Sequence, residues 1–291
     1  MKKQDKIVII TVTYNSQRYL KNLLISLKKQ GEILSIIFVD NNSLDGTKKI
    51  IKQEQKKGDN IYLIENKRNE GFAKATNTGI KYGLKNLKAD YFFLLNPDTV
   101  IEENLFKELI FWDKKLSNSV LCPKILIKKN KKIWWEGTKI FKIKDLLTNL
   151  KLSNSIHINK EKEDSEVKKF PYETEAITGC AVFFRKSIIE KIGYLDEKFF
   201  MYGEDLDYSL RLRKKGYKIF VIPNAIVYHD VLLEKESFKN REEIKKNIKR
   251  WKNYLKSSIL LIQKHFSISY ALIWFFRMPF AIIYEITKRI K

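Results

Sequence analysis

The sequence predicts an α/β fold built on a parallel sheet, and two observations lead to this expectation. Up to residue 120, short apolar runs alternate with segments whose apolar residues recur at helical spacing. Strands that alternate with helices are typical of parallel βαβ units with right-handed crossovers. Three apolar runs lead directly into polar signatures, namely Thr13-Tyr14-Asn15, Asp40-Asn41-Asn42-Ser43 and Asn96-Pro97-Asp98-Thr99. Because ligands of open parallel sheets bind outside the carboxyl ends of the strands, we expect one binding site there.

The elements expected in this first half follow one another closely. The strands are Ile7–Val12, Ile33–Val39, Ile61–Ile64 and Tyr91–Leu95. The first helix should place Leu20, Leu23, Leu24 and Leu27 on one face and end near Gly31, and the others are expected at Thr47–Gln55, Gly71–Leu87 and Glu102–Leu116. Asp45 precedes the second helix and is expected to cap it. Residues 1–120 therefore resemble a nucleotide-binding layer.

The pattern is less regular after Val120. A short β-excursion with Trp134 and Trp135 is expected within Ile125–Ile143, followed by a charged surface loop at Lys144–Lys169. Next we expect a buried strand at Thr174–Arg185, a helix at Ser187–Ile192, a helix at Leu206–Lys215 that Gly216 ends, and a strand at Tyr217–Ile222 that Pro223 ends.

Composition narrows the class of protein. With 44% hydrophobic residues the chain can bury a core, while its formal net charge is +23. Of the 57 basic residues, 48 are Lys. Readers of bases and phosphates favour the bidentate Arg fork, and no nucleic-acid motif is visible, so we expect no nucleic-acid partner. Attraction to an anionic membrane surface fits this charge better. Cys122 and Cys180 lie in apolar stretches and are expected to be buried.

The C-terminal segment, residues 236–291, is expected to be a basic helical tail. Residues 241–291 hold twelve Lys or Arg and three Glu, a net charge of +9. The uncharged stretch Phe266–Phe276 is followed by Arg277 and Pro279, whereas a spanning helix needs about 20 apolar residues. An amphipathic helix lying on the membrane surface fits this pattern, and helices packed on the core are the alternative. Since Met1–Lys6 leads directly into a strand without a signal-peptide pattern, we expect a cytoplasmic protein, peripheral on the inner face of the plasma membrane.

Two acidic residues of the strand-end signatures are candidates for ligand binding. The carboxylate of Asp40 could accept hydrogen bonds from a nucleobase or a ribose, or could form a turn or helix cap. Asp98 follows a hydrophobic strand, where one carboxylate together with substrate phosphates could hold Mg²⁺ or Mn²⁺. Its alternative role is in the Pro-Asp turn before the next helix.

A second acidic group opens the helix expected near residue 206. Asp205 could act as a general base, and Glu204 belongs to the same pair, although acids also favour a helix N-terminus for electrostatic reasons. Asp207 and Arg211 can pair on the helix surface at a spacing of four residues. His229 could complete the coordination of a cation beside Asp98, or could be structural.

Six ordered motifs resemble those of one enzyme family. They are Val-Thr-Tyr-Asn, Val-Asp-Asn-Asn-Ser, Asn-Glu-Gly-Phe-Ala-Lys-Ala-Thr-Asn, Leu-Asn-Pro-Asp-Thr, Thr-Gly-Cys-Ala and Phe-Phe-Met-Tyr-Gly-Glu-Asp-Leu-Asp, spread over residues 6–230. This order is similar to that of family 2 inverting glycosyltransferases with a GT-A fold, and in particular to their bacterial rhamnosyltransferase-like branch. The resemblance implies a Rossmann-like mixed sheet over residues 1–235, with a nucleotide-sugar-binding half at 1–120 and an acceptor and catalytic half at 121–235.

The resemblance also implies roles for individual residues. Donor-binding roles fall on Thr13, Tyr14, Asn15, Asp40, Asn42, Gly71, Lys74, Asn77 and Asn96. Asp40 would meet the base, and Gly71, Lys74 and Asn77 would lie along the ribose, phosphates or sugar. Asp98 and His229 would hold Mg²⁺ or Mn²⁺, with Asn96 standing where the family's Asp-x-Asp motif has its first carboxylate. Asp205 would deprotonate the acceptor hydroxyl, with Glu204 beside it.

The expected activity is transfer of a sugar, rhamnose or a similar hexose, from a nucleotide-diphosphate donor. The acceptor would be a glycan or a lipid-linked glycan in the synthesis of bacterial surface polysaccharide. Alternatives are a UDP-hexose or UDP-N-acetylhexosamine donor, or an inactive membrane-associated scaffold, because a fold does not settle the substrate. Trp134, Trp135 and Tyr202 could stack on sugar rings, with at least one Trp in the core.

Overall fold

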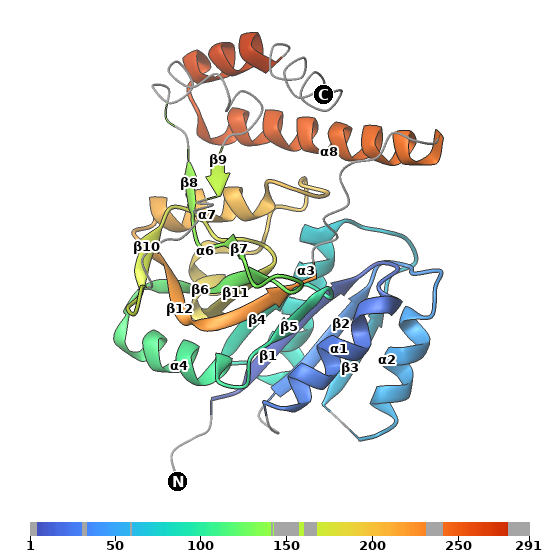
Figure 1. Ribbon diagram of the computed structural model, residues 1–291. Coiled ribbons are helices and arrows are strands. Elements are labelled where there is room, and N and C mark those ends of the chain that lie inside the picture. Colours follow the sequence, from blue (N-terminus) through green and yellow to red (C-terminus); the bar gives the residue numbers. More distant parts are fainter. Residues whose placement is uncertain are drawn as a thin grey trace.

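A computed structural model shows one mixed sheet flanked by helices, with two further helices beyond α7 at one end of the molecule (Figure 1). The structure describes residues 5–30, 34–58, 60–140, 142, 157–159, 168–230 and 241–278. The strand order of the main sheet is β10-β12-β6-β11-β4-β1-β2-β3, with β5 beside β12 and β7 beside β6.

The first half confirms the expected βαβ alternation. Strands β1 (Ile7–Thr13), β2 (Leu34–Asp40), β3 (Ile61–Glu65) and β4 (Tyr91–Leu95) are parallel, in the order β3-β2-β1-β4. They alternate with α1 (Gln17–Lys28), α2 (Thr47–Gln55), α3 (Phe72–Tyr82), which continues as the π-helical turn η1 (Gly83–Leu87), and α4 (Leu105–Lys115). Helices on the sheet explain why these strands are continuous apolar runs.

The second half turns the sheet into a mixed one. The strand β11 (Ala181–Arg185) runs antiparallel between β4 and β6 (Ser119–Ile127), and β12 (Lys218–His229) runs parallel to β6. Three short strands join this sheet, namely β5 (Thr99–Ile101), β7 (Ile133–Trp135) and β10 (Tyr172–Thr174). Two others, β8 (Thr138–Ile140) and β9 (His157–Asn159), form a separate antiparallel pair. Among the described residues of this half, α6 (Lys186–Ile192) and α7 (Glu204–Lys214) are helices.

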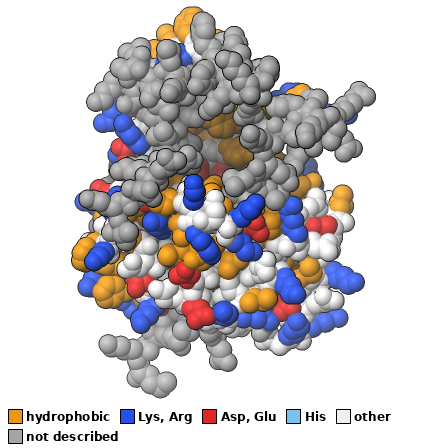
Figure 2. Space-filling model, in the orientation of Figure 1, with side chains coloured by type: hydrophobic (Ala, Val, Ile, Leu, Met, Phe, Trp, Pro, Cys, Tyr) orange, Lys and Arg blue, Asp and Glu red, His pale blue; other side chains and the backbone are white. Residues whose placement is uncertain are grey.

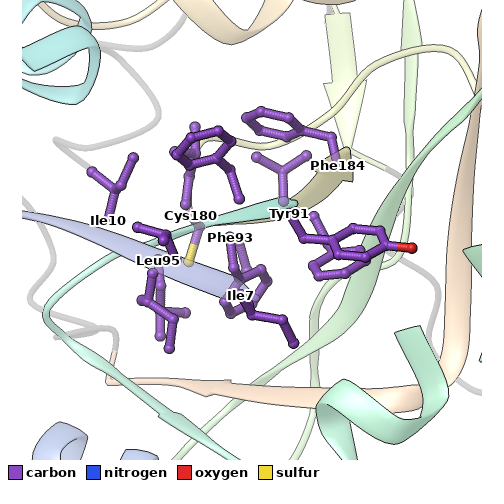
Figure 3. Packing of buried hydrophobic residues seen from close by; sticks show 14 of the residues in the cluster. Ile7, Ile10, Tyr91, Phe93, Leu95, Cys180 and Phe184 are labelled. Atoms are coloured by element: carbon purple, nitrogen blue, oxygen red, sulfur yellow. The ribbon is translucent and has the colours of Figure 1, made fainter. Parts of the chain in front are cut away.

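The hydrophobic core packs the sheet against its flanking helices, and apolar side chains of the neighbouring strands β1, β4 and β11 form part of it (Figure 3). The rings of Tyr91 and Phe183 stack with centroids 4.9 Å apart. Cys122 and Cys180 are both buried in this core, as expected, and burial raises the pKa of each thiol far above its ordinary value. Neither thiol is therefore a nucleophile at neutral pH.

Several expectations for the second half were wrong. The strand expected to stop at Pro223 continues as β12 to His229, because an irregularity between Ile222 and Ile226 accommodates a residue that has no N–H. The single strand expected at Thr174–Arg185 is absent: β10 ends at Thr174, and the next strand is Ala181–Arg185. The strand β6 begins at Ser119, before the expected β-excursion, and β9 lies inside the expected surface loop. Most of that loop lies outside the described residues.

Two helix starts also differ. The helix expected from Glu102 begins at Leu105, because β5 occupies the preceding residues. The N-cap of α2 is Gly46 rather than Asp45. Asp45 instead accepts hydrogen bonds from the N–H of Thr47 and the N–H of Gln17, and so joins the starts of α1 and α2. Burial opposes ionisation of Asp45, but these bonds together with that from the Thr47 hydroxyl outweigh it and lower its pKa.

The C-terminal helices pack on the second half of the fold. Helix α8 (Arg241–His265) contacts α7. A second apolar cluster joins α7, α8 and a helix at 268–278, and it includes Phe199, Leu206, Leu261, Ile262, Tyr270 and Trp274. The described residues of this segment therefore pack on the rest of the fold, and contact with a membrane surface stays a prediction. No helix within the described ranges is long and apolar enough to cross a membrane.

Candidate active site

The carboxyl end of β2 is organised by Asp40. Its side chain is fully buried, and its carboxylate accepts hydrogen bonds from the Thr13 hydroxyl at 2.9 Å and from the N–H of Ser43 at 2.8 Å. The Ser43 hydroxyl donates a third, at 2.5 Å. Thr13 is equally buried. Asp40 therefore fixes the loop after β2, and a direct contact with a base stays a prediction.

The side chains that line the rim of this end are Tyr14, Asn15 and Asn42. Tyr14 is half exposed, and Asn15 and Asn42 have φ angles of 51° and 65°, a left-handed conformation that Asn tolerates. The N–H of Asn15 donates to the Ser43 hydroxyl, and its side-chain oxygen accepts from the N–H of Leu44. The exposed ring of Tyr14 is thus held on an ordered loop, free to stack on a planar ligand.

Asn41 links the loops around the site, although nothing in its spacing singled it out from its neighbours. Its amide donates to the carbonyl of Gly71 at 3.1 Å and accepts from the Asn66 amide at 2.8 Å. Gly71 has φ 86°, and a Cβ there would lie 2.4 Å from the carbonyl oxygen of Phe200. The glycine therefore permits the loop before α3 to touch the segment that precedes α7.

Lys74 and Asn77 lie on α3, and the structure gives both internal partners. Lys74 pairs with Glu70 at 2.7 Å. The buried amide of Asn77 donates to the carbonyl of Leu195 at 2.9 Å and to the Glu197 carboxylate at 3.0 Å, and it accepts from the N–H of Leu195. Asn77 thus braces the loop before α7, and the donor contacts expected of both residues stay predictions.

Asp98 and His229 are brought together by the pairing of β5 with β12. Thr99 lies opposite His229 in that pairing, and the N–H of Asp230 donates to the carbonyl of Asp98. Nε2 of His229 lies 3.2 Å from Oδ2 of Asp98. Trp134 packs its edge against the imidazole, with ring centroids 4.4 Å apart. The expected neighbourhood of these two residues is therefore present.

Asp98 and His229 supply a carboxylate and an imidazole, donor types that divalent cations use, and metal binding by them stays a prediction. Oδ1 of Asp98 and Nδ1 of His229 are buried, and no described residue forms a hydrogen bond with either atom. A buried polar atom without a partner is costly, so a ligand that binds there would be favoured. No three potential metal-ligating side chains cluster within the described ranges. Mg²⁺ commonly uses one or two carboxylates and takes its other ligands from phosphates and water.

The acidic pair opens α7 directly after Gly203, whose φ is 83°. The partly exposed Asp205 accepts hydrogen bonds from the N–H of Gly179 at 3.2 Å and the N–H of Leu206 at 2.8 Å. The buried Glu204 differs: burial, and then the charge of Asp205, raise its pKa to about 8. The raised pKa favours the protonated form of Glu204, and of the two acids Asp205 is the one open to an acceptor.

The three strand ends and α7 converge on one edge of the sheet. The N–H of Asn96 donates to the carbonyl of Cys180, the neighbour of the Gly179 that holds Asp205. On the other side, the N–H of Phe72 donates to the carbonyl of Phe200, just before α7. Short chains of contacts therefore connect Asp98 to Asp205, and Asp205 to the loop that follows Asp40.

Asp207 is the centre of a charged cluster, only part of which was expected. Its predicted partner Arg211 lies 2.9 Å away, and two further partners, Lys264 at 2.5 Å and His265 at 2.7 Å, come from α8. Burial opposes ionisation of Asp207, but the bonds from these three side chains outweigh it and lower its pKa to about 2. A local motif gives no signal for partners that lie more than fifty residues away.

The three aromatic residues considered for sugar stacking differ in their exposure to solvent. Trp135 is buried and donates its indole N–H to the Thr138 hydroxyl, which confirms a core role for one Trp. Trp134 is partly exposed beside His229, and Tyr202 is exposed just before α7. Both of these rings lie at the edge where the acids converge.

Fold and site define a glycosyltransferase of the GT-A fold class. The model of the family "Glycosyl transferase family 2" matches residues 8–193, and the chain belongs to that family. The chain is 27% identical over 244 residues to the low-salt glycan biosynthesis hexosyltransferase Agl10 of Haloferax volcanii, covering 82% of this chain and 72% of the relative. It is 25% identical over 232 residues to the dTDP-rhamnosyl transferase RfbF of Shigella flexneri, and the match covers 78% of this chain and 70% of that relative.

Among solved structures, GalNAc-T7 with UDP, GalNAc and Mn²⁺ is similar in fold. The TM-score is 0.63 at 15% identity, and the match covers 87% of this chain and 49% of that one. The chain therefore spans about half the length of GalNAc-T7. At this identity the likeness concerns the fold alone.

Proposed function

We propose that the protein is a metal-dependent inverting hexosyltransferase that moves rhamnose or a similar hexose from a nucleotide-diphosphate donor. The proposed acceptor is a glycan or lipid-linked glycan, used at the cytoplasmic face of the plasma membrane in the synthesis of a surface polysaccharide. The single observation that carries the proposal is the convergence of Asp98, His229 and Asp205 at the carboxyl edge of the sheet. Relatives named as hexosyl- and rhamnosyltransferases support the substrate class.

The residues divide into donor and acceptor sides. On the donor side, Tyr14 offers a face for the base, and Asp98 with His229 would hold Mg²⁺ or Mn²⁺ at the diphosphate. When bound, the cation supplies Lewis-acid stabilisation to the departing nucleoside diphosphate. On the acceptor side, the Asp205 carboxylate takes the proton of the acceptor hydroxyl as its oxygen attacks the anomeric carbon. Attack and departure on opposite faces of the sugar invert the anomeric configuration.

Substitution of the proposed base tests this function. Asp205→Asn keeps the size and one of the two acceptor oxygens of the side chain, so we expect donor binding to persist while transfer falls by ~10²-fold or more, the size of a lost general base. A screen of nucleotide sugars with the wild-type chain, with Mn²⁺ and with chelator, identifies the donor by metal-dependent hydrolysis. An Asp205→Asn enzyme that transfers sugar at the wild-type rate would refute the assignment. Failure of every nucleotide sugar to bind would favour an inactive scaffold.

A further inference from the structure

The helix at 268–278 has one buried face and one exposed apolar face. Tyr270 and Trp274 are buried in the apolar cluster that also contains Leu206 of α7 and Leu261 and Ile262 of α8. The opposite face carries Ile268, Leu272, Phe275 and Phe276, whose exposed fractions are 81%, 54%, 61% and 71%. These four residues follow helical spacing, so they form one continuous stripe. Single exposed apolar side chains are common, but a contiguous stripe of large ones marks an interaction surface.

The neighbouring helix α8 exposes several basic residues. The exposed side chains of α8 include Lys245, Ile248, Lys252, Lys256 and Ile259, which recur at intervals of three or four residues along one face. From residue 244 to residue 278 the sequence contains no Asp or Glu and eight basic residues: Lys245, Lys246, Lys249, Arg250, Lys252, Lys256, Lys264 and Arg277. Apolar stripes with Lys alongside and no acids are typical of helices that lie on anionic membranes.

The two helices lie at one end of the molecule, beyond α7 and away from the sheet (Figure 1). Hydrophobic side chains reach the surface at that end in the space-filling view (Figure 2). We propose that Ile268, Leu272, Phe275 and Phe276, with Lys245, Lys252 and Lys256 of α8, form a docking face for an anionic lipid bilayer. The chain would lie on the bilayer with this face down, and its apolar stripe would enter the acyl boundary.

Charge selects a bilayer over a second copy of the chain. Two copies that each carry +23 repel one another, whereas an anionic leaflet attracts every exposed Lys near its surface. The docking face is also joined to the catalytic helix, because Ser257 donates to the carbonyl of Met201 and Lys264 pairs with Asp207. Docking would therefore hold the acidic edge close to lipid, where a lipid-linked acceptor lies. This last point rests on the proposed function, whereas the docking itself does not.

Co-sedimentation of the full chain with vesicles, without donor or acceptor, tests the docking face. We expect binding to phosphatidylcholine vesicles that contain phosphatidylglycerol, little binding to phosphatidylcholine alone, and loss of binding at high salt. The double variant Phe275→Ser/Phe276→Ser and the double variant Lys252→Glu/Lys256→Glu should each weaken binding about 10-fold or more.

Matched control variants distinguish binding through this face from non-specific binding through other exposed aromatic or basic side chains. Phe170→Ser removes another exposed aromatic ring, and Lys186→Glu/Lys191→Glu makes the same charge change on α6. Both controls should sediment like the wild type. The proposal is overturned if no vesicle binds, if both lipid mixtures bind equally, or if the controls lose binding as much as the test variants. It is also overturned if light scattering shows a dimer that Phe275→Ser/Phe276→Ser dissociates while vesicles stay unbound. Metal-dependent donor hydrolysis, measured separately, shows whether the proposed function itself has failed.

Discussion

Nζ of Lys264, near the end of α8, lies 2.5 Å from Oδ1 of Asp207, two residues after the proposed catalytic base. Asp207 is fully buried, and Lys264 also contacts Asp196 at 2.7 Å, in the loop that precedes α7. The Lys264 side chain therefore links α8 to both α7 and the loop before it. The C-terminal segment thus helps to hold α7, the helix that carries Asp205, in place.

Removal of this cation should weaken both the fold and the reaction. Lys264→Met keeps most of the packing volume but leaves the buried Asp207 with only Arg211 and His265. We expect a loss of ~1–3 kcal/mol in the free energy of unfolding, typical of a hydrogen bond to a charged group. The turnover number should fall more than the affinity for donor. Lys191→Met, at an exposed position on α6, should change neither quantity.

The same cluster sets the acid limit of stability. The pKa of Asp207 is about 2 in the folded chain, below its ordinary value of 3.8. Its ionised form therefore stabilises the fold fully above pH 4, and this contribution disappears as the pH falls toward 2. Urea unfolding of wild type and Lys264→Met between pH 2 and pH 6 should show a shallower acid decline in the variant. Parallel curves would contradict this assignment.

Glu204 should produce the opposite pH dependence. Its pKa rises from the ordinary 4.5 to about 8, so between these values the folded chain binds more protons than the unfolded one. Stability from this group is therefore lost as the pH rises from 4.5 through 8. Glu204→Gln stays neutral and should lack this loss, so its stability advantage should grow toward pH 8. Glu190→Gln, exposed on α6, is the control and should follow the wild type in urea titrations.

His229 should matter for donor binding only when metal is present. Nδ1 of His229 has no described partner, and its Nε2 faces Asp98, so His229→Gln removes a candidate ligand with little change in volume. We expect the affinity for nucleotide sugar in Mn²⁺, measured by calorimetry, to fall by ~10-fold or more. In chelator the variant and the wild type should bind equally. A drop of the same size under both conditions would indicate a packing role beside Trp134 instead.

Gly71 and Gly58 form a matched pair that tests the contact between the donor and acceptor sides. Both have positive φ, 86° and 85°, but a Cβ at Gly58 meets nothing within 4 Å, whereas at Gly71 it meets the Phe200 carbonyl. Gly58→Ala therefore measures the backbone strain alone. Gly71→Ala should lose ~1–3 kcal/mol more, the usual cost of overpacking, and should also reduce transfer. Equal losses in thermal or urea unfolding would show that the clash is relieved without cost.

The first half of the fold could be predicted because its signals are local. Apolar runs at strand length, helical spacing of Leu20 to Leu27 and strand-end polar residues all lie within short windows. The second half offered weaker signals. Pro123 and Lys124 break the apolar run of β6 in the sequence, and Pro223 lies inside β12. Both strands are nevertheless continuous, because they pair with each other along nearly their whole length. Such pairing between distant segments overrides local breakers.

The sequence alone determined the βαβ order, the edge of the sheet where the polar signatures meet, and the residue types available there, because these depend on neighbours along the chain. Only the tertiary structure decided which of those side chains remain available to a ligand. Asp40 and Asn77 turn their polar atoms to internal partners, while Asp98 and His229 keep buried atoms unpartnered among the described residues. Whether a polar group has a partner depends on segments that folding brings from far away, so no local pattern contains that information.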